Sequence, residues 1–343
     1  MCQRRFSRNI CGRAFTIALY LAGALWFSGT AVSGQQLSIR HYDVSNGLAH
    51  SHVSAIHQDA KGYLWLATWE GLSRFDGYRF SNYDQRDGLG DPIINAIAED
   101  RMGHLWVGTN GGGVARLIDD PHSPSSDSST PRPKFISFRV GDSSLSNRVN
   151  SLVFDSRNNL WCATDGGLYR AFIGQETELN FEAVVSESVE MDAAFADSHG
   201  RLWFGMPNAL LEIAQGQIIK YESADTDVAR HSIKDITEDR QGRLLVANER
   251  EIFEFQPPPD NNRRGSWQPL PLSFKPHQGI HAIASGPDGA LWIGTWDGLV
   301  KYRDGQQTIY TSLQGLSDND VRSLTEDRDG NLWIGTFEVQ PAR

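Results

Sequence analysis

Indole rings, carboxylates and an amide occupy one recurring position and the residue after it at four places in this sequence. The residues concerned are Trp69, Glu70, Asn110, Asp165, Trp296 and Asp297. An indole ring covers the C–H face of a sugar, and neighbouring polar groups bind its hydroxyls. These residues are therefore candidates for binding a small molecule such as an oligosaccharide. The alternative is that they simply suit the turn in which each of them lies.

Other chemistry-bearing groups give weaker signals. His50, His52 and His57 are the densest histidine group and could begin a metal site, but they also fit a loop that leads into a strand. Aspartate recurs as a turn residue, so no carboxylate pair for glycoside hydrolysis can be singled out. The strings that mark serine hydrolases, zinc proteases and phosphate-binding loops are missing from the sequence. We therefore expect no catalytic residues, no metal and no cofactor.

The candidate binding residues belong to a motif that recurs seven times. Its anchors are Trp65, Trp106, Trp161, Trp203, Leu245, Trp292 and Trp333. A period near forty residues accommodates four short strands and indicates stacked structural units. The sequence therefore predicts an all-β protein, a seven-bladed β-propeller of four-stranded antiparallel blades.

Positions within the repeat have physical meanings. Apolar residues lie 12 and 9 positions before the anchor, as at Val53 and Ile56, and this offset predicts opposite faces of one strand. Six positions before most anchors an aspartate, Asp59 in the first copy, can accept backbone N–H bonds in a turn. Three positions before, Gly62 and its counterparts tolerate a positive φ. Two positions after, a small residue such as Ala67 lets neighbouring sheets approach closely.

The first 34 residues differ from the rest. Four arginines and no acidic residue precede an apolar run from Ala14 to Phe27 and then a stretch of small residues. This order is typical of a secretory signal peptide, so we expect residues 1–34 to be a signal peptide and residues 35–343 a periplasmic or otherwise extracytoplasmic sensor domain. Without the four arginines the formal net charge falls from −10 to −14. Such a surface repels phosphate backbones, which excludes nucleic acid as a partner.

Several further segments are assigned from the repeat. The Pro- and Ser-rich segment 119–133 is expected to be a disordered insertion. Outer strands are expected at Tyr78–Tyr83, Phe135–Arg139, Phe181–Val185, Ile218–Tyr221, Leu270–Phe274 and Thr308–Tyr310. Leu37–Tyr42 is expected to be an outer strand that partly completes the last blade, which is itself expected to be incomplete at the C-terminus.

Strings such as Gly315-Leu316-Ser317-Asp318-Asn319-Asp320-Val321, followed by Glu326-Asp327-Arg328-Asp329-Gly330-Asn331-Leu332-Trp333-Ile334-Gly335-Thr336, resemble the two-component regulator propeller repeat. The resemblance covers residues 37–336. It implies a seven-bladed propeller from the periplasmic part of a bacterial receptor that carries a histidine kinase or diguanylate cyclase. It also implies a small-molecule ligand, commonly an oligosaccharide.

Residues 337–343 depart from the repeat, and no membrane helix or output domain follows them. We therefore expect a ligand-sensing module without its output domain. Membrane attachment is expected only through missing downstream segments, and a receptor dimer is possible in the full-length form. The alternative is a secreted propeller enzyme, a lyase or hydrolase, that acts on carbohydrate.

Overall fold

The computed structural model describes residues 39–118, 134–174, 179–186, 189–222, 231–258, 265–273, 279–286 and 288–337. These residues belong to one compact unit, Ile39–Arg343. The expected signal peptide (1–34) and insertion (119–133) lie outside the described residues.

Antiparallel strands make up almost all of the regular structure. The first blade contains β1 (Val53–Gln58), β2 (Leu64–Thr68), β3 (Gly71–Phe75) and β4 (Phe80–Tyr83). The second contains β5 (Ile94–Glu99), β6 (Leu105–Thr109), β7 (Val114–Leu117) and β8 (Phe135–Phe138). The third contains β9 (Val149–Phe154), β10 (Asn159–Thr164), β11 (Gly167–Phe172) and β12 (Phe181–Ser186).

The next three blades repeat this order. The fourth contains β13 (Ala193–Ala196), β14 (Leu202–Met206), β15 (Ala209–Ala214) and β16 (Gln217–Glu222). The fifth contains β17 (Ile233–Glu238), β18 (Leu244–Asn248), β19 (Ile252–Gln256) and β20 (Ser266–Pro269). The sixth contains β21 (Ile280–Ser285), β22 (Leu291–Thr295), β23 (Gly298–Arg303) and β24 (Gln306–Tyr310).

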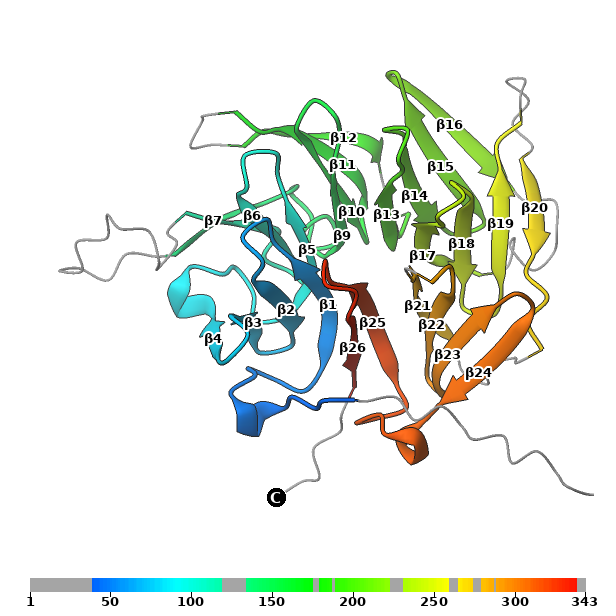
Figure 1. Ribbon diagram of the computed structural model, residues 1–343. Helices are drawn as coiled ribbons and strands as arrows, with labels where there is room; N and C mark the ends of the chain where they lie inside the picture. The colour runs from blue at the N-terminus through cyan, green and yellow to red at the C-terminus, as the bar shows by residue number, and fades with distance from the viewer. Residues whose placement is uncertain are drawn as a thin grey trace, which may run out of the picture. The chain divides into compact units, whose positions relative to one another are not determined.

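The seventh copy of the repeat forms a hairpin of β25 (Val321–Glu326) and β26 (Leu332–Thr336). In the described part of the chain, three short 3₁₀ helices lie in loops: η1 (Val44–Asn46), η2 (Gln85–Asp87) and η4 (Ser312–Gln314). Each ends at a glycine with positive φ. Figure 1 shows β1, β5, β9, β13, β17, β21 and β25 as the innermost strands. Each of them contacts the next, and β25 contacts β1, so the innermost strands form a closed ring.

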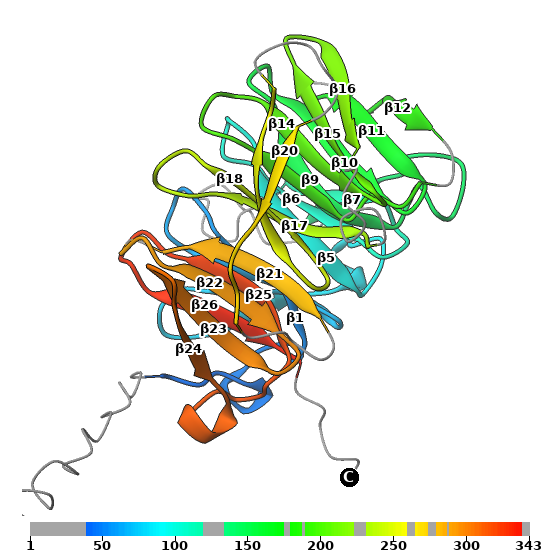
Figure 2. The ribbon, with the colours of Figure 1, turned by 90° about the vertical axis from the view of Figure 1, so that its right-hand side faces the viewer.

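The prediction of seven four-stranded blades is wrong. The described residues form six four-stranded blades and one two-stranded hairpin. Figure 2 shows the hairpin beside the sixth blade. In five blades every residue of the second strand is buried, and in the third blade all but Asn159 are buried, whereas Leu332, Trp333 and Ile334 of β26 are partly exposed. Within the residues described up to Phe337, the seventh repeat thus has the inner half of a blade, without the covering that a third strand supplies in the other blades.

Two expected outer strands are also wrong. Ile39–Tyr42 forms no strand, and residues 37 and 38 lie outside the described residues. The Tyr42 ring instead stacks on Trp333 with centroids 5.8 Å apart and meets Phe75 edge-on, so aromatic packing places this segment. In the fifth blade the outer strand is Ser266–Pro269, not Leu270–Phe274, because Trp267 packs on Phe255 at 4.6 Å.

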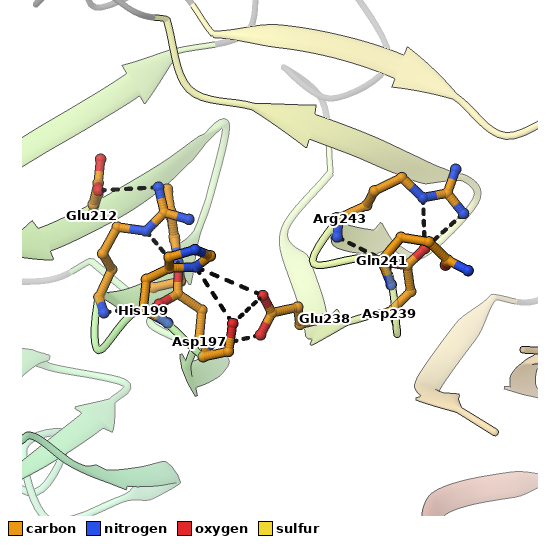
Figure 3. Close-up of polar contacts among 10 residues, drawn as sticks. Asp197, His199, Glu212, Glu238, Asp239, Gln241 and Arg243 are labelled. Atoms are coloured by element: carbon orange, nitrogen blue, oxygen red, sulfur yellow. Dashed lines mark hydrogen bonds and ion pairs between the residues drawn. The ribbon is translucent and has the colours of Figure 1, made fainter. Parts of the chain in front are cut away.

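The repeated aspartate joins a turn to the anchor tryptophan. In the first blade Asp59 accepts the Tyr63 amide through Oδ1 at 2.9 Å and the Trp65 indole N–H through Oδ2 at 2.7 Å. The indole bond recurs in the copies anchored by Trp106, Trp161, Trp203 and Trp333. Where leucine replaces tryptophan, Asp239 accepts Arg243 Nε at 2.6 Å instead, as Figure 3 shows. The repeated aspartate therefore holds the anchor indole in place as well as the turn.

The expected opposite placement of the two apolar columns is wrong because of a β-bulge. Val53 pairs with Thr68 and Ile56 with Leu66, with a register shift between Val53 and Ala55. Since Thr68 and Leu66 are two residues apart, Val53 and Ile56 lie on one face. The same shift occurs in β5, β17, β21 and β25.

The small residue after the anchor does permit close approach of neighbouring blades. A Cβ added to Gly108 would lie 2.6 Å from Cγ1 of Val149, which begins the next inner strand. Gly205 has the same relation to Ile233, and Gly294 to Val321. The prediction from this column is confirmed.

Side chains of the seventh hairpin bind the first blade directly. Ser323 Oγ donates to the Val53 carbonyl at 3.0 Å, and Thr325 Oγ1 donates to the Ile56 carbonyl at 2.7 Å. The Arg328 amide donates to Gln58 Oε1 at 2.9 Å, much as the Ser198 amide donates to Glu238 between the fourth and fifth blades. The hairpin therefore connects the last repeat to the first without an additional strand.

Candidate functional site

The two candidate tryptophans lie in equivalent turns, each between the second and third strand of a blade. Trp69 and Glu70 connect β2 to β3, and Trp296 and Asp297 connect β22 to β23. A threonine that ends the second strand accepts a turn amide in each case, Thr68 from Glu70 and Thr295 from Asp297. These tight turns leave Trp69 41% and Trp296 38% exposed.

The other candidates occupy the same repeat position. The Asn110 amide donates to the Ile93 carbonyl at 3.0 Å, and the Asp165 amide donates to the Arg148 carbonyl at 3.2 Å. These bonds tie each turn to the residue just before an inner strand. All four turns therefore lie at the same end of their blades, which we call the loop face.

The seventh hairpin brings Trp69 and Trp296 into one group. Phe337, which follows β26, lies 5.5 Å from the Trp69 ring, and the Arg322 guanidinium lies over both Phe337 and Trp296 at 5.5 and 4.5 Å. Two histidines complete the group: His52 stacks on Trp69 at 4.1 Å, and His281 lies 5.3 Å from Trp296. With Asp320, we call these residues the loop-face cluster: His52, Trp69, His281, Trp296, Asp320, Arg322 and Phe337.

Asp165 belongs to a different set of contacts on the loop face. Its carboxylate lies 3.6 Å from Arg148 and accepts Asn150 Nδ2 at 2.8 Å. Asn110 forms an isolated bridge with the same Arg148. The structure therefore links Asn110 with Asp165, and Trp69 with Trp296, as two separate pairs.

The loop-face cluster contains buried polar atoms that lack a hydrogen-bond partner among the described residues. They are His52 Nδ1, His281 Nε2, Asp320 Oδ1 and Arg322 Nε. His52 is 6% exposed and Asp320 is 7% exposed. Arg322 donates to Asp320 Oδ2 at 2.7 Å, which leaves the other carboxylate oxygen, and His281 Nε2 lies 3.6 Å from it. Buried polar groups in folded proteins are nearly always paired, so these four atoms mark where the cluster keeps unused hydrogen-bonding capacity.

Burial and the Arg322 charge set the protonation of this cluster. Burial, followed by Arg322, lowers the pKa of His52 from 6.5 to about 4, and the same two causes lower the pKa of His281 to about 4. Burial raises the pKa of Asp320 above 3.8, although the bond and charge of Arg322 oppose this. At neutral pH both imidazoles are uncharged, and each ring nitrogen can donate or accept according to its tautomer.

Two repeat columns contain three residues of the loop-face cluster that were not predicted, Phe337, Arg322 and His281. Phe337 occupies the position of Trp69 and Trp296 in the seventh copy, four residues after the anchor. Every copy has a polar residue at the position that lies 11 residues before the anchor. These residues are Ser54, Asn95, Asn150, Asp192, Lys234, His281 and Arg322. A polar residue directly after the apolar position at the start of each inner strand is the sequence pattern from which Arg322 and His281 could have been predicted.

The histidine-rich segment contacts the loop-face cluster. His50 Nδ1 accepts the His52 amide at 2.9 Å, and the His50 ring lies 6.3 Å from Trp69. Within the described residues no group of three or more His, Cys, Asp or Glu side chains could hold a metal ion. Among these residues there is also no helix whose length and hydropathy would let it cross a bilayer.

Comparison with known proteins identifies the repeats. The two component regulator propeller family matches residues 47–70, 88–111, 143–166, 275–297 and 315–338. Five segments of the chain therefore match this repeat family, as the sequence indicated. Four of the five matched segments end within three residues of Trp69, Asn110, Asp165 or Trp296, so the candidate turns are part of the family motif.

Solved structures share the fold at low identity. The extracellular domain of a putative hybrid two component system from B. thetaiotaomicron is 20% identical, with a TM-score of 0.67, over 87% of this chain and 40% of that chain. Virginiamycin B lyase from Staphylococcus aureus is 14% identical, with a TM-score of 0.67, over 87% of this chain and 95% of that chain. A search of curated proteins gives no significant match. These likenesses establish the propeller fold, and this chain spans less than half the length of the two component relative.

Proposed function

We propose that this chain is the extracytoplasmic ligand-sensing module of a bacterial signal-transduction receptor, and that it binds a small molecule, an oligosaccharide, at the loop-face cluster. The family supplies the receptor context, and the signal-like first 34 residues supply the location. The role is binding rather than turnover.

The observation that carries the proposal is the combination of exposed rings and unsatisfied buried polar atoms in one cluster. Trp69 and Trp296 offer indole surfaces for the C–H faces of sugar rings. Between them, Arg322 Nε and Asp320 Oδ1 have no partner among the described residues. A site of apolar surface with a few converging polar groups is the usual form of a small-molecule site.

The experiment is calorimetry of the chain with a panel of oligosaccharides of different sugar composition, followed by repetition with variants. We expect Trp69→Ala combined with Trp296→Ala to weaken binding by at least tenfold. The reason is that each sugar ring stacked on an indole contributes on the order of 1 kcal/mol to the binding free energy. The matched control is Tyr78→Ala, which removes a 93% exposed ring from the β3–β4 turn at the other end of the first blade.

Two outcomes would contradict the proposal. Undiminished binding by the double variant would move the site away from the loop-face cluster. A panel without any binder, measured on a chain whose thermal unfolding shows it to be folded, would remove the oligosaccharide from the proposal.

A further inference from the structure

We infer that the loop-face cluster selects an uncharged, hydroxyl-bearing sugar unit and rejects units that carry carboxylate, sulfate or ammonium groups. This inference rests on the proposed function and specifies the ligand class of the same site. It comes from the hydrogen-bonding capacity of two atoms, Arg322 Nε and Asp320 Oδ1.

These two atoms make opposite demands on a ligand. Arg322 Nε carries a hydrogen and can only donate, whereas the carboxylate oxygen Asp320 Oδ1 can only accept. Both are buried and without a partner among the described residues. A hydroxyl group both accepts and donates, so one hydroxyl or two adjacent ones can satisfy both atoms. A carboxylate or sulfate in the place of that hydroxyl can only accept and would leave Asp320 Oδ1 unpaired, and an ammonium in the same place can only donate and would leave Arg322 Nε unpaired.

The charge balance of the cluster favours the same class. The Arg322 charge is already paired with Asp320, with Nη2 and Oδ2 2.7 Å apart. Burial and Arg322 keep His52 and His281 neutral. The cluster therefore carries no net charge at neutral pH, and a charged ligand would gain no ion pair there in return for its own desolvation.

The rest of the loop face opposes anions. Carboxylates occupy the turns and the starts of the inner strands at Glu70, Asp165, Asp192, Glu249 and Asp297. The facing cations are already engaged, since Arg148 lies 3.6 Å from Asp165 and Lys234 binds Asp192 at 2.8 Å. The surplus of carboxylates repels an approaching anionic glycan.

The neutral imidazoles add to the hydroxyl site without adding charge. His281 Nε2 lies 3.6 Å from Asp320 Oδ1, which is too long for a direct hydrogen bond, so both atoms keep hydrogen-bonding capacity for a hydroxyl. His52 Nδ1 is buried and unpaired among the described residues, beside the Trp69 ring. Several hydroxyls of one sugar can thus form hydrogen bonds with the cluster while the C–H face of the sugar packs against an indole.

The test uses the full chain and a matched pair of probes. Neutral glucan, mannan and galactan hexasaccharides, a galacturonan hexasaccharide, a chondroitin sulfate hexasaccharide and a chitosan hexasaccharide are titrated by calorimetry. The tightest neutral binder is then oxidised at C6, so that each –CH₂OH becomes a carboxylate on the same backbone. We expect the oxidised probe, and the sulfated and amino sugars, to bind at least tenfold more weakly than the neutral parent.

Variants of Asp320 separate this inference from general loss of structure. Asp320→Asn keeps the shape but replaces the acceptor-only carboxylate, so we expect weaker binding of the neutral parent and a smaller ratio between parent and oxidised probe. Asp304→Asn is the control, because Asp304 is an exposed carboxylate in the β23–β24 turn at the opposite end of its blade. Equal or tighter binding of the oxidised probe would overturn the selectivity while leaving the binding function standing. Failure of every neutral and charged glycan to bind would overturn the proposed function and the selectivity with it.

Discussion

Truncation of a buried anchor tryptophan is the sharpest test of the fold. Trp106 is fully buried, donates to Asp100 Oδ2 at 3.2 Å and lies against Phe138, Phe154 and the Arg116 guanidinium. A buried indole removes about 250 Å² from water, which at roughly 25 cal/mol per Å² sets an upper limit near 6 kcal/mol. Measured truncations of such rings cost about 3–5 kcal/mol.

The partner of the indole moderates this cost. Asp100 still accepts the amides of Met102 and His104 and the His104 ring when Trp106 is gone, so no isolated charge is left. We therefore expect Trp106→Ala to lower the free energy of unfolding by about 4 kcal/mol. Trp69→Ala, which removes a 41% exposed ring, should cost less than about 1.5 kcal/mol.

Urea unfolding followed by circular dichroism measures both variants against the parent chain. Trp106→Phe separates ring packing from the indole hydrogen bond, and it should lie between Ala and the parent. Equal losses for Trp106→Ala and Trp69→Ala would refute the assignment of one ring to the core and the other to the loop face.

Three further perturbations have expected results. The pKa values of His52 and His281 are lowered from 6.5 to about 4, so the unfolded chain binds more protons between these values and stability should fall as the pH drops through this window; a double His→Gln variant should flatten the thermal-unfolding profile there. Burial raises the pKa of Asp235 from 3.8 to about 7, so the folded chain binds more protons in that range and the contribution of Asp235 to stability should decline as the pH rises through this window; Asp235→Asn should remove this part of the pH dependence of urea unfolding, and an unchanged dependence would count against the assignment. Gly205→Ala should cost about 1–3 kcal/mol in urea unfolding, because the new Cβ would lie 2.8 Å from the Ile233 carbonyl oxygen; a neutral result would show that the blades can move apart.

The parts of the fold that depend on local sequence could be predicted. Trp106 and every other anchor except Trp333 are buried because the anchor lies on the second strand, in the interior of a complete blade, and Asp59 accepts a turn amide because the Asp–Gly spacing demands that turn. The bulge after Val53 could not be found from an apolar offset, since a bulge changes which residues share a face. The prediction of an outer strand at Leu37–Tyr42 was also wrong, because the conformation of this segment depends on a distant partner. Tyr42 packs on Trp333, and no local property of Ile39–Tyr42 distinguishes that packing from strand pairing.

The candidate site could be predicted in part for the same reason. Trp69 and Trp296 were found because equivalent turns of a repeat lie at the same end. Phe337 was missed because residues 337–343 were interpreted as a departure from the repeat, although Phe337 keeps the turn position and its amide bonds the Asp320 carbonyl at 2.8 Å. Arg322 and Asp320 were missed because their unpaired atoms become visible only when the burial of both side chains is known.

A crystal structure of the full chain with the tightest neutral oligosaccharide tests the central claim most directly. We predict a sugar ring against Trp69 or Trp296, with hydroxyl oxygens within hydrogen-bond distance of Arg322 Nε and Asp320 Oδ1. A sugar bound at another surface, with these two atoms still unpaired or occupied by another part of the chain, would contradict the account.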